Sequence, residues 1–315
     1  MTTARVSLTE EFGDAFSGRR ALVTGATGFI GWHLASALVE LGAEVHALAR
    51  SAQQGSVPVG CKAWGVDLAN LEPLRQAFRS VRPDIVYHVA SVVDGRQDRD
   101  LVLPTLQANL VGAVQLALAC DEAGCGHIVA VGSSEERDGE GASAVPASPY
   151  AAAKTSASLY FRMFHRLFGL PVVLVRPFMT YGPRQAARKL IPYTIAALLR
   201  GEAPRLSSGS RVCDFVFVTD VVRGLLRAGL AHDTHGETFD LGTAIGTPVR
   251  DVVELVVELS GSAARPVFGA VPDRPGERPL VANGAPARAR LGWEPCWSLR
   301  DGLTETIAWH REHAA

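Results

Sequence analysis

Short apolar runs alternate with longer amphipathic stretches between Arg20 and about Arg176, and this alternation constrains the fold more than any other feature of the chain. Strands that alternate with helices form right-handed βαβ units, whose strands lie in a mostly parallel sheet covered on both faces. Continuous apolar strands agree with this arrangement, because parallel strands are buried on both sides. The sequence therefore predicts an α/β fold with a doubly wound parallel sheet. The runs with the length of buried strands are RALVT, AEVHALA, DIVYHVA, HIVAVGS and PVVLVRP.

The second half of the chain differs in composition, because Pro and Gly are frequent and the predicted helices and strands are shorter. The chain has 315 residues, and single cores rarely grow beyond roughly 250–300 residues. We therefore expect a tail with one short helix over 1–19 and a sheet domain over 20–178. Residues 212–245, which include the strand-like DFVFV, are expected to return to that sheet. Residues 179–211 and 246–315 are then expected to form a smaller C-terminal α/β lobe.

Charge and hydropathy argue against several kinds of partner. The chain has 31 basic and 32 acidic side chains and a net charge of -1, whereas a nucleic-acid surface needs a basic excess. No stretch approaches the ~20 uninterrupted apolar residues of a membrane-spanning helix, so we expect no membrane partner. The polar, acidic start of the chain lacks the apolar core of a secretory signal, and this favours a cytoplasmic protein.

The cysteine and histidine patterns predict neither disulfides nor a metal site. Five cysteines without a CxxC pair are typical of reduced thiols in a cytoplasmic protein. His232 and His235 lie three residues apart, in a segment with the composition of a loop and without an HExxH pattern. We interpret them, like His310 and His313, as solvated pairs.

A glycine-rich turn, TGATGFIG, follows the first apolar run and precedes an apolar helix-like stretch. Gly25 suits the positive φ of a tight turn, Gly28 lets the backbone approach a pyrophosphate, and Gly31 lets helix and strand pack closely. The amino terminus of the helix offers unpaired N–H groups to phosphates. This position between a strand and a helix predicts a dinucleotide-binding turn. The same turn also contains Thr27, Phe29 and Ile30.

The residues after the second apolar run indicate which dinucleotide binds. NAD sites tend to carry an acid there, which accepts a hydrogen bond from the 2′-hydroxyl of the ribose. This chain has no acid in the sequence ALARS, and Arg50 and Ser51 have the chemistry to bind a 2′-phosphate. NADP(H) is therefore favoured, with NAD(H) as the alternative. Asp67 and Leu68, after the third strand, are expected beside the adenine.

Tyr150 and Lys154 stand four residues apart, which places a phenol and an ammonium on one face of a helix. The usual pKa of a tyrosine, ~10, makes its phenol a poor base at neutral pH. A neighbouring lysine cation lowers that pKa by stabilising the phenolate. We therefore expect this pair to move a proton to or from a substrate hydroxyl.

Together these motifs resemble those of the extended short-chain dehydrogenase/reductase family, in its NAD(P)-dependent nucleotide-sugar epimerase, dehydratase and 4-ketoreductase branch. The resemblance runs from Arg20 onwards and rests on GATGFIG, YHVAS, SSEE, YAAAK, RPFMTYGPRQ, DFVFVTD and RARLGWEPCWSL. It implies a Rossmann-type domain, a smaller lobe that binds the nucleotide sugar, and a homodimer. The dimer would pack the helices that contain Asn109 and Tyr150 into a four-helix bundle.

The resemblance also implies roles for individual residues. Ser134 would hydrogen-bond the reacting sugar oxygen and orient Tyr150, and Lys154 would also bind the nicotinamide ribose. Glu135 and Glu136 would supply the acid and the base of a dehydratase, although 4-ketoreductases of the branch often carry the same SSEE. Further cofactor contacts are implied for Val89, Ala90, Ser91, Asn109, Ser133, Tyr150, Lys154 and Pro177. Substrate contacts are implied for Val92, Ser134, Glu135, Tyr150, Met179, Lys189, Arg211 and Arg278.

Three departures from the family pattern concern the sugar site. The tripeptide Arg137-Asp138-Gly139 stands where a Tyr-Gly pair is usual, so an aromatic residue is missing. Met179 replaces a polar Asn, and Cys213 replaces an arginine that binds the diphosphate. Arg211 would substitute for that arginine only if its strand bulges. Arg278 is the best single candidate for a diphosphate contact, because guanidinium groups bind phosphate bidentately.

These features favour three functions, in a definite order. The first is NADPH-dependent reduction of a nucleotide-linked 4-keto-6-deoxyhexose at C4, in which Tyr150 protonates the new oxyanion; Arg50 favours it because NADPH is the reductive cofactor. The second is a nucleotide-sugar epimerase or 4,6-dehydratase with tightly bound NAD(P), which Glu135 and Glu136 leave open. The third is an inactive binding protein on the same fold, against which the intact Tyr150 and Lys154 argue.

Overall fold

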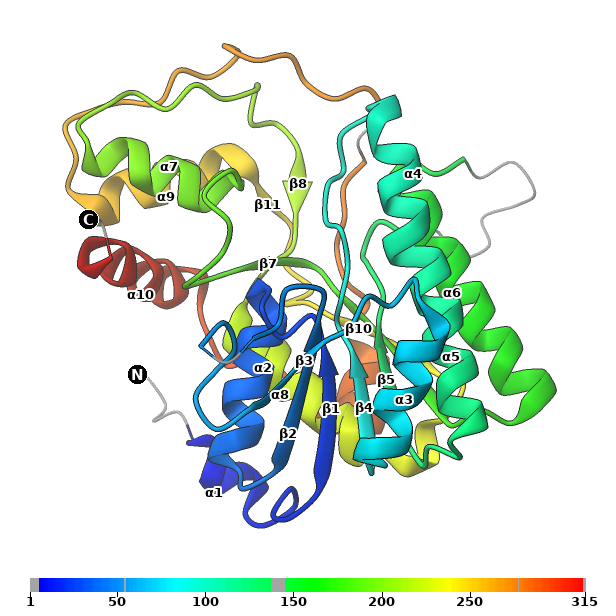
Figure 1. Cartoon of the computed structure of the whole chain (residues 1–315). Coiled ribbons are helices and arrows are strands. Elements are labelled where there is room, and N and C mark those ends of the chain that lie inside the picture. Colours follow the sequence, from blue (N-terminus) through cyan, green and yellow to red (C-terminus); the bar gives the residue numbers. More distant parts are fainter. Residues whose placement is uncertain (1–5, 54, 137–144, 277, 314–315) are drawn as a thin grey trace. The chain divides into compact units, whose positions relative to one another are not determined.

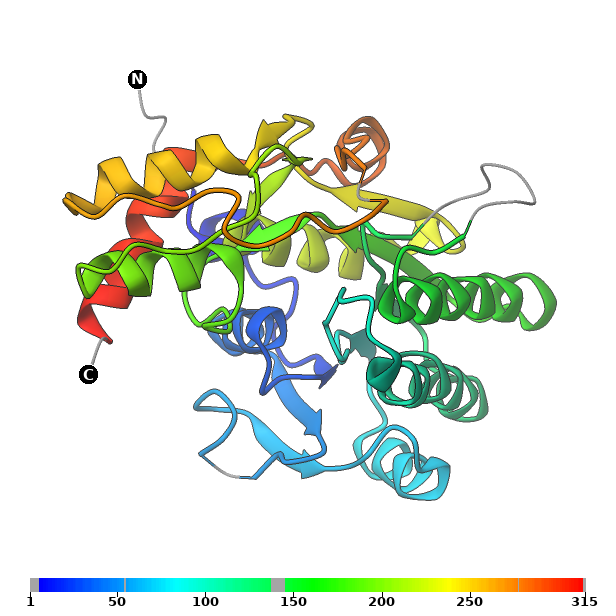
Figure 2. The ribbon, with the colours of Figure 1, turned by 90° about the horizontal axis from the view of Figure 1, so that it is seen from above.

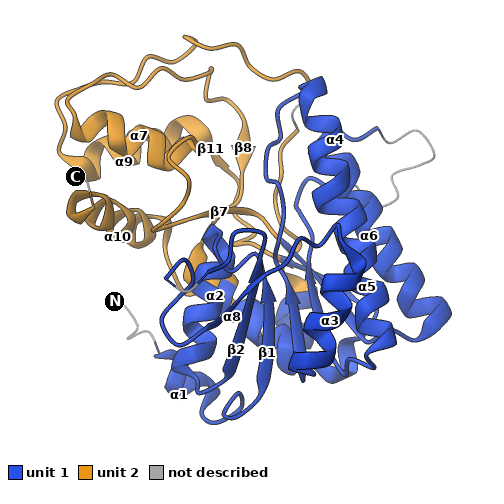
Figure 3. Ribbon diagram, in the orientation of Figure 1, with its two compact units in different colours: residues 1–176, 222–240, 286–293 blue, residues 177–221, 241–285, 294–315 orange. Residues whose placement is uncertain are grey.

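The computed structural model describes residues 6–53, 55–136, 145–276 and 278–313, and the chain divides into two compact units (Figure 3). Each unit is built from segments that are distant in the sequence. The first unit comprises residues 1–176, 222–240 and 286–293, and the second comprises 177–221, 241–285 and 294–315.

The unit boundaries differ from those expected from the sequence in three places. Residues 6–19 belong to the first unit and are not a separate tail, whereas 212–221 and 241–245 belong to the second. Residues 286–293 return to the first unit, where Trp293 is 2% exposed and Arg290 pairs with Glu237 at 2.8 Å. These placements depend on contacts between distant segments, which local sequence patterns do not reveal.

A seven-stranded sheet forms the centre of the first unit, in the order β10-β6-β5-β4-β1-β2-β3 (Figure 1). β1 pairs in parallel with β2 and β4, β2 with β3, β4 with β5, and β5 with β6. The predicted doubly wound parallel sheet is thus confirmed, and its strands end at a common edge where ligands of such folds bind. The strands are β1 (Arg20–Thr24), β2 (Glu44–Ala49), β3 (Lys62–Gly65), β4 (Ile85–His88), β5 (Ile128–Val131), β6 (Val172–Pro177) and β10 (Thr238–Leu241).

Helices cover both faces of this sheet: α3, α5 and α6 lie on one face, and α2 and α8 on the other (Figures 1 and 2). The helices of the first unit are α1 (Leu8–Phe12), α2 (Phe29–Glu40), α3 (Leu71–Val81), α4 (Val102–Thr105), α5 (Gly112–Glu122), α6 (Pro149–Phe168) and α8 (Val218–Leu230), the last of which begins in the second unit. Short helical segments are η1 (Arg99–Leu101), η2 (Leu106–Val111), η3 (His232–Thr234) and η4 (Ala287–Leu291).

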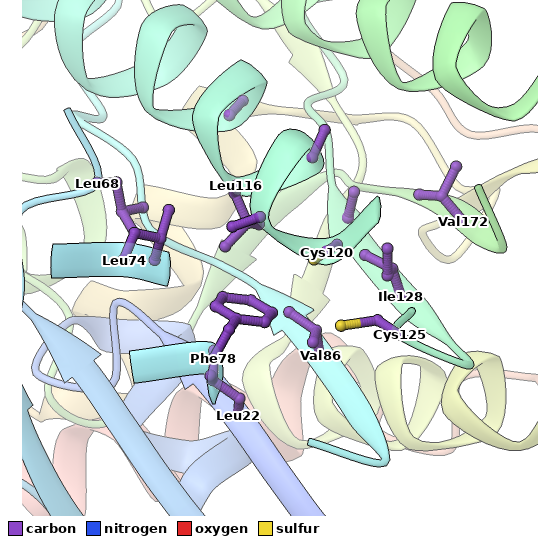
Figure 4. Packing of buried hydrophobic residues seen from close by; sticks show 14 of the residues in the cluster. Leu22, Leu68, Leu74, Phe78, Val86, Leu116, Cys120, Cys125, Ile128 and Val172 are labelled. Atoms are coloured by element: carbon purple, nitrogen blue, oxygen red, sulfur yellow. The ribbon is translucent and has the colours of Figure 1, made fainter. Parts of the chain in front are cut away.

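A core of the first unit, called the larger core here because it exceeds that of the second unit, lies between the sheet and α3, α5 and α6 (Figure 4). Leu22, Val86 and Ile128 extend from the strands and meet Phe78 and Leu116 from the helices, each at most 1% exposed. Full burial of side chains of this size contributes about 1.5–3 kcal/mol each to folding. All five cysteines are unpaired, as their spacing predicted, and Cys120 and Cys125 lie within this core.

The N-terminal helix α1 is held on the first unit by both polar and apolar contacts. Ser7 and Glu10 form a capping box that satisfies its first N–H groups. Glu11, whose side chain is 5% exposed, accepts hydrogen bonds from Arg223 at 2.6 Å and Arg227 at 2.8 Å, both on α8. These ion pairs therefore hold α1 against α8, in the segment 222–240 that returns to the first unit.

Within the described residues, the second unit contains two small sheets, the helices α7, α9 and α10, and the start of α8. β7 (Met179–Tyr181) pairs in parallel with β9 (Phe215–Phe217), and β8 (Val212–Cys213) pairs antiparallel with β11 (Thr247–Pro248). α7 (Leu190–Leu199), α9 (Val249–Ser260) and α10 (Leu299–Glu312) pack around a core that includes Ile195, Phe217, Val252 and Leu303. The buried Asp214 fixes a turn of this unit, because its carboxylate accepts hydrogen bonds from the N–H groups of Thr243 and Ala244.

One helical run of the described residues, 99–122, is long and apolar enough to cross a membrane by length and composition, so our expectation that no stretch approaches such a span needs correction. A third of its most apolar window is buried inside the structure. The run consists of η1, α4, η2 and α5, and its α5 part contributes to the larger core. A core helix of a globular domain passes the same test.

Candidate active site

The glycine turn connects β1 to α2 and has almost no room for side chains. Gly25 has φ +73°, and a Cβ at this position would lie 2.7 Å from the Cα of Ala90. A Cβ at Gly31 would lie 2.2 Å from the carbonyl oxygen of Gly25, so only glycine permits this contact between helix and turn. Gly28 is the N-cap of α2 and provides no side-chain cap, which leaves the first N–H groups of the helix available to an anion.

The side chain of Thr24 joins this turn to the end of β4. Its hydroxyl accepts hydrogen bonds from the N–H groups of Val89 and Ala90, each at 3.1 Å. The hydroxyl lies 3.0 Å from Nδ1 of His88, to which it donates its own proton. Burial lowers the pKa of His88 to about 3, which keeps the imidazole neutral. The sequence analysis did not single out Thr24 and His88, whose only signal was their place at two strand ends.

Tyr150 lies near the start of α6 and is 7% exposed. Burial raises the pKa of its phenol, and hydrogen bonds to the side chains of Ser133 and Ser91 oppose this effect. In the structure two serine hydroxyls lower this pKa, and the expected effect of Lys154 stays a prediction. The hydroxyl of Ser133 accepts the N–H of Glu135 at 3.1 Å, so its proton is available to the phenol oxygen.

Lys154 is 5% exposed, one helical turn beyond Tyr150 on α6. Its ammonium donates a hydrogen bond to the carbonyl oxygen of Val131, the last residue of β5. Burial lowers the pKa of Lys154, and the charge of Glu136 opposes this effect. The helix therefore presents Tyr150 and Lys154 to the carboxyl end of the sheet. Ser148 caps α6 by accepting the N–H of Ala151 at 3.1 Å, and this fixes where the helix starts.

The two glutamates after Ser134 have different environments. Glu136 is 8% exposed, and its carboxylate accepts the N–H of Ser133 at 2.8 Å and a hydrogen bond from the side chain of Ser158. Glu135 and Ser134 are half-buried, and the negative charge of Glu135 raises the pKa of Tyr150. Glu136 thus holds the Ser133 loop, and the negative charges of both glutamates raise the pKa of Tyr150. The Arg137-Asp138-Gly139 departure lies outside the described residues.

The side-chain amide of Asn109 holds the loop after β4 in place by hydrogen bonds. Its Oδ1 accepts hydrogen bonds from the N–H of Val92 at 2.7 Å and from the hydroxyl of Ser91 at 3.1 Å, and its Nδ2 donates to the carbonyl of Val92 at 3.0 Å. Asn109 lies in η2, a π-helical segment that periodicity did not predict. The expected contact between Asn109 and the cofactor stays a prediction; in the structure its amide holds Ser91 and Val92 in the loop beside Tyr150.

Other residues expected at the dinucleotide lie along the same edge of the sheet. Arg50 and Ser51 directly follow β2 and are exposed. Asp67 follows β3 and accepts the N–H of Ala69 at 3.0 Å, while Leu68 is buried against Gly112 of α5. The others are Thr27, Phe29 and Ile30 at the start of α2, and Pro177 at the end of β6.

The second unit contains four of the residues expected to bind the sugar nucleotide, and the other four lie in the first unit. Cys213 forms a parallel bridge with Leu280, so the chain segments that carry Arg211 and Arg278 run side by side. Arg211 is half-buried and Arg278 is exposed. Met179 is half-buried and packs against the core of this unit, as an apolar side chain requires. Lys189 is half-buried at the N-cap of α7.

The backbone around the glycine turn of the first unit is suited to bind a dinucleotide. Added Cβ atoms at Gly25 and Gly31 would collide with main-chain atoms, the helix N-terminus lacks a side-chain cap, and its first turn contains no acid. The buried Tyr150 and Lys154 lie on α6, where Lys154 bonds to the last residue of β5 in the same sheet. This combination suits hydride transfer coupled to the movement of one proton.

Comparisons with known proteins agree with this chemistry. Residues 21–242 match the model of the family described as NAD dependent epimerase/dehydratase family. A UDP-glucose 4-epimerase of Mycolicibacterium smegmatis is 31% identical over 93% of this chain and 98% of its own. A dTDP-glucose 4,6-dehydratase of an Actinoplanes species is 30% identical over the same shares.

Solved structures are similar over almost the whole chain. The UDP-glucose 4-epimerase of Thermotoga maritima, solved with UDP-glucose, has a TM-score of 0.86 at 28% identity and covers 94% of this chain and 99% of its own. The UDP-glucose 4-epimerase of Thermus thermophilus, solved in complex with NAD, has a TM-score of 0.82 at 29% identity and covers 93% and 99%.

Proposed function

The chain belongs to the NAD dependent epimerase/dehydratase family and is a nucleotide-sugar enzyme, and on this premise we propose that it oxidises and reduces C4 of a nucleotide-linked hexose. The first candidate reaction is 4-epimerisation. The observation that carries the proposal is the buried pair of Tyr150 and Lys154, with Ser133 and Ser91 bonded to the phenol, beside the glycine turn.

The residues of the chain divide the proton chemistry among them. Tyr150 exchanges a proton with the C4 oxygen of the sugar, and the hydroxyl of Ser133, whose proton is available, stabilises the phenolate that forms. Lys154 holds a positive charge at the end of β5. A bound NAD(P) would supply the hydride acceptor for C4 and a positive charge that favours the phenolate.

The environment of Glu136 argues against 4,6-dehydration. The family pattern requires an acid and a base at positions 135 and 136 for the loss of the C6 hydroxyl and the C5 proton. Glu136 already accepts a backbone N–H of Ser133 and a hydrogen bond from Ser158, and it is 8% exposed. Its withdrawal from these bonds would leave a buried N–H without a partner, at a cost of ~1–3 kcal/mol.

The second candidate is NADPH-dependent reduction of a nucleotide 4-keto-6-deoxyhexose. Arg50 favours this reaction, because it is an exposed cation directly after β2 in a segment without an acid. A 2′-phosphate would bind such a guanidinium strongly. For either reaction we propose a UDP- or dTDP-linked hexose as substrate, with its diphosphate on Arg211 and Arg278, since UDP-glucose is bound by the Thermotoga maritima relative.

One experiment separates these reactions. Purified protein is denatured and the released cofactor is identified, and the native protein is then incubated with UDP-glucose or UDP-galactose without added cofactor. We expect bound NAD(P) and interconversion of the two sugars. Oxidation of added NADPH by a nucleotide 4-keto-6-deoxy sugar, without interconversion, would instead establish the reductase. Release of water from dTDP-glucose would overturn the argument from Glu136, and no turnover of any of these would leave a binding protein.

We also propose that the protein is a cytoplasmic homodimer. Its five unpaired cysteines support a reducing compartment. Support for the dimer comes from apolar side chains on the neighbouring α4, η2 and α6 (Figures 1 and 2). These side chains are between 39% and 68% exposed, and two such surfaces would form a four-helix bundle. They belong to Val102, Leu103, Leu106, Leu159, Tyr160, Leu167 and Phe168.

A further inference from the structure

Three histidines from two distant segments meet at the amino-terminal edge of the sheet in the first unit. His127 directly precedes β5, whereas His232 and His235 lie in and after η3, between α8 and β10. Their candidate ligand nitrogens all lie within 4.8 Å of one another. The sequence analysis interpreted His232 and His235 as a solvated pair, but the structure adds a third imidazole that is 1% exposed.

The hydrogen bonds of His127 determine which of its nitrogens is available. Its Nε2 lies 2.8 Å from the carbonyl oxygen of Ala228. A carbonyl can only accept, so Nε2 carries the proton and Nδ1 presents a lone pair to His235. Histidines that bind metals commonly donate their second N–H to a backbone carbonyl in this way, because the bond fixes the tautomer and the ring orientation.

The distances among the three rings suit a metal ion after a small adjustment. Nδ1 of His127 lies 2.8 Å from Nε2 of His235, which donates a hydrogen bond across this gap. Two nitrogen ligands at ~2.0–2.1 Å from a tetrahedral zinc ion stand about 3.3 Å apart. His235 is half-buried and His232 is exposed, so both side chains have room to move and an ion has a route in from solvent. Binding would shift the proton of His235 to its other ring nitrogen.

We propose that His127, His232 and His235 bind a transition-metal ion, with Zn²⁺ as the ion that fits best and a fourth position open to water. Imidazole nitrogens suit Zn²⁺, whereas Mg²⁺ and Ca²⁺ require oxygen ligands.

The position of the three histidines indicates a structural role for the ion. They lie at the start of β5, whereas Ser133 and the other residues around Tyr150 lie after its end. Segment 222–240 enters the first unit from the second, and it carries His232 and His235. An ion shared with His127 would therefore clamp this segment to a central strand of the sheet.

The test is direct zinc binding by the full chain without an affinity tag. Zn²⁺ alone is titrated by calorimetry, Co²⁺ absorption reports coordination geometry, and thermal unfolding is followed with and without Zn²⁺. We expect one ion per chain, a tetrahedral Co²⁺ spectrum and a zinc-dependent rise in Tm. His232→Gln and His235→Gln should each weaken binding by roughly tenfold or more and abolish the rise.

The matched control is His313→Gln, because His313 is an exposed histidine on the second unit and should leave zinc affinity unchanged. The His232 and His235 variants alter exposed or half-buried side chains, so they are expected to fold. Absence of zinc binding by the unmodified chain would overturn the proposal. Zinc affinity that is equal in the unmodified chain and in both variants would overturn it as well.

Discussion

Tyr150 obtains its hydrogen-bond partners from two strand ends rather than from its own helix. Ser91 follows β4 and Ser133 follows β5, and both hydroxyls lower the pKa of a phenol that burial raises. The resemblance to known enzymes pointed to Ser134, which is half-buried next to Ser133. Whether Ser133 or Ser134 assists the proton transfer by Tyr150 can therefore be tested by substituting each serine in turn.

Ser133→Ala should lower kcat by roughly 10- to 100-fold, because it removes a hydrogen bond to a developing phenolate worth about 1.5–3 kcal/mol. Without that bond the pKa of Tyr150 rises, so the acidic limb of the kcat–pH profile should move to higher pH. Ser134→Ala is the matched control and should shift this limb less. A larger shift for Ser134→Ala would transfer the role to Ser134.

Arg50 is the residue on which the choice of cofactor depends. Arg50→Asp should weaken NADP binding by roughly tenfold or more and affect NAD much less, because it replaces a phosphate-binding cation by an acid that accepts a ribose hydroxyl. Fluorescence titration with each dinucleotide measures both constants. An unchanged ratio of the two dissociation constants would exclude a contact between Arg50 and the 2′-phosphate.

At the scale of elements, the turn between β1 and α2 depends on the absence of side chains. The carbonyl oxygen of Gly25 would lie 2.2 Å from a Cβ at Gly31, a distance that no side chain tolerates. The same helix has a free amino terminus because Gly28 provides no cap. The packing of α2 against β1 and the anion-binding end of α2 therefore have a common origin.

Gly31→Ala should lower the free energy of unfolding by about 1–3 kcal/mol, because α2 must move away from the turn. The displaced helix should also lose cofactor affinity. Chemical denaturation and dinucleotide titration measure the two effects. Gly126→Ala is the control, since no atom lies within 4 Å of a Cβ at Gly126 and the substitution should change neither quantity. Normal cofactor affinity in Gly31→Ala would contradict the assigned role of the turn.

At the scale of the whole molecule, the apolar surface of α4, η2 and α6 determines the expected assembly. Leu103 is 68% exposed on α4, and Leu159 is 56% exposed on α6, whose opposite face is buried. Large exposed apolar patches mark association sites in soluble proteins. In a symmetric dimer each side chain of this surface would be buried by the same surface of the second copy.

The double substitution Leu103→Lys and Leu159→Lys should convert the dimer to a monomer, because it would bury four charges in the proposed bundle. Light scattering after gel filtration measures the mass. Val59→Lys is the control, because Val59 is 95% exposed and lies far from α4 and α6 in the sequence. A dimer that survives the double substitution would show that the copies associate through another surface.

The sequence by itself determined the parallel sheet, the glycine turn and the Tyr150–Lys154 pair, because each depends on a short pattern: apolar runs of strand length, three glycines between strand and helix, and a spacing of four on a helix. These patterns act locally, so their physical consequences can be read without the rest of the chain. The hydrogen-bond partners of these groups could be identified only from the three-dimensional structure.

Only the tertiary structure placed the hydroxyl of Ser133 at the phenol of Tyr150 and showed that Asn109 holds the Ser91 loop. It also brought His127 to His235, which lie 108 residues apart in the sequence. Each of these contacts joins the ends of different strands or the segments that follow them. Which strand ends become neighbours depends on the order of strands in the sheet, and burial of the whole core fixes that order.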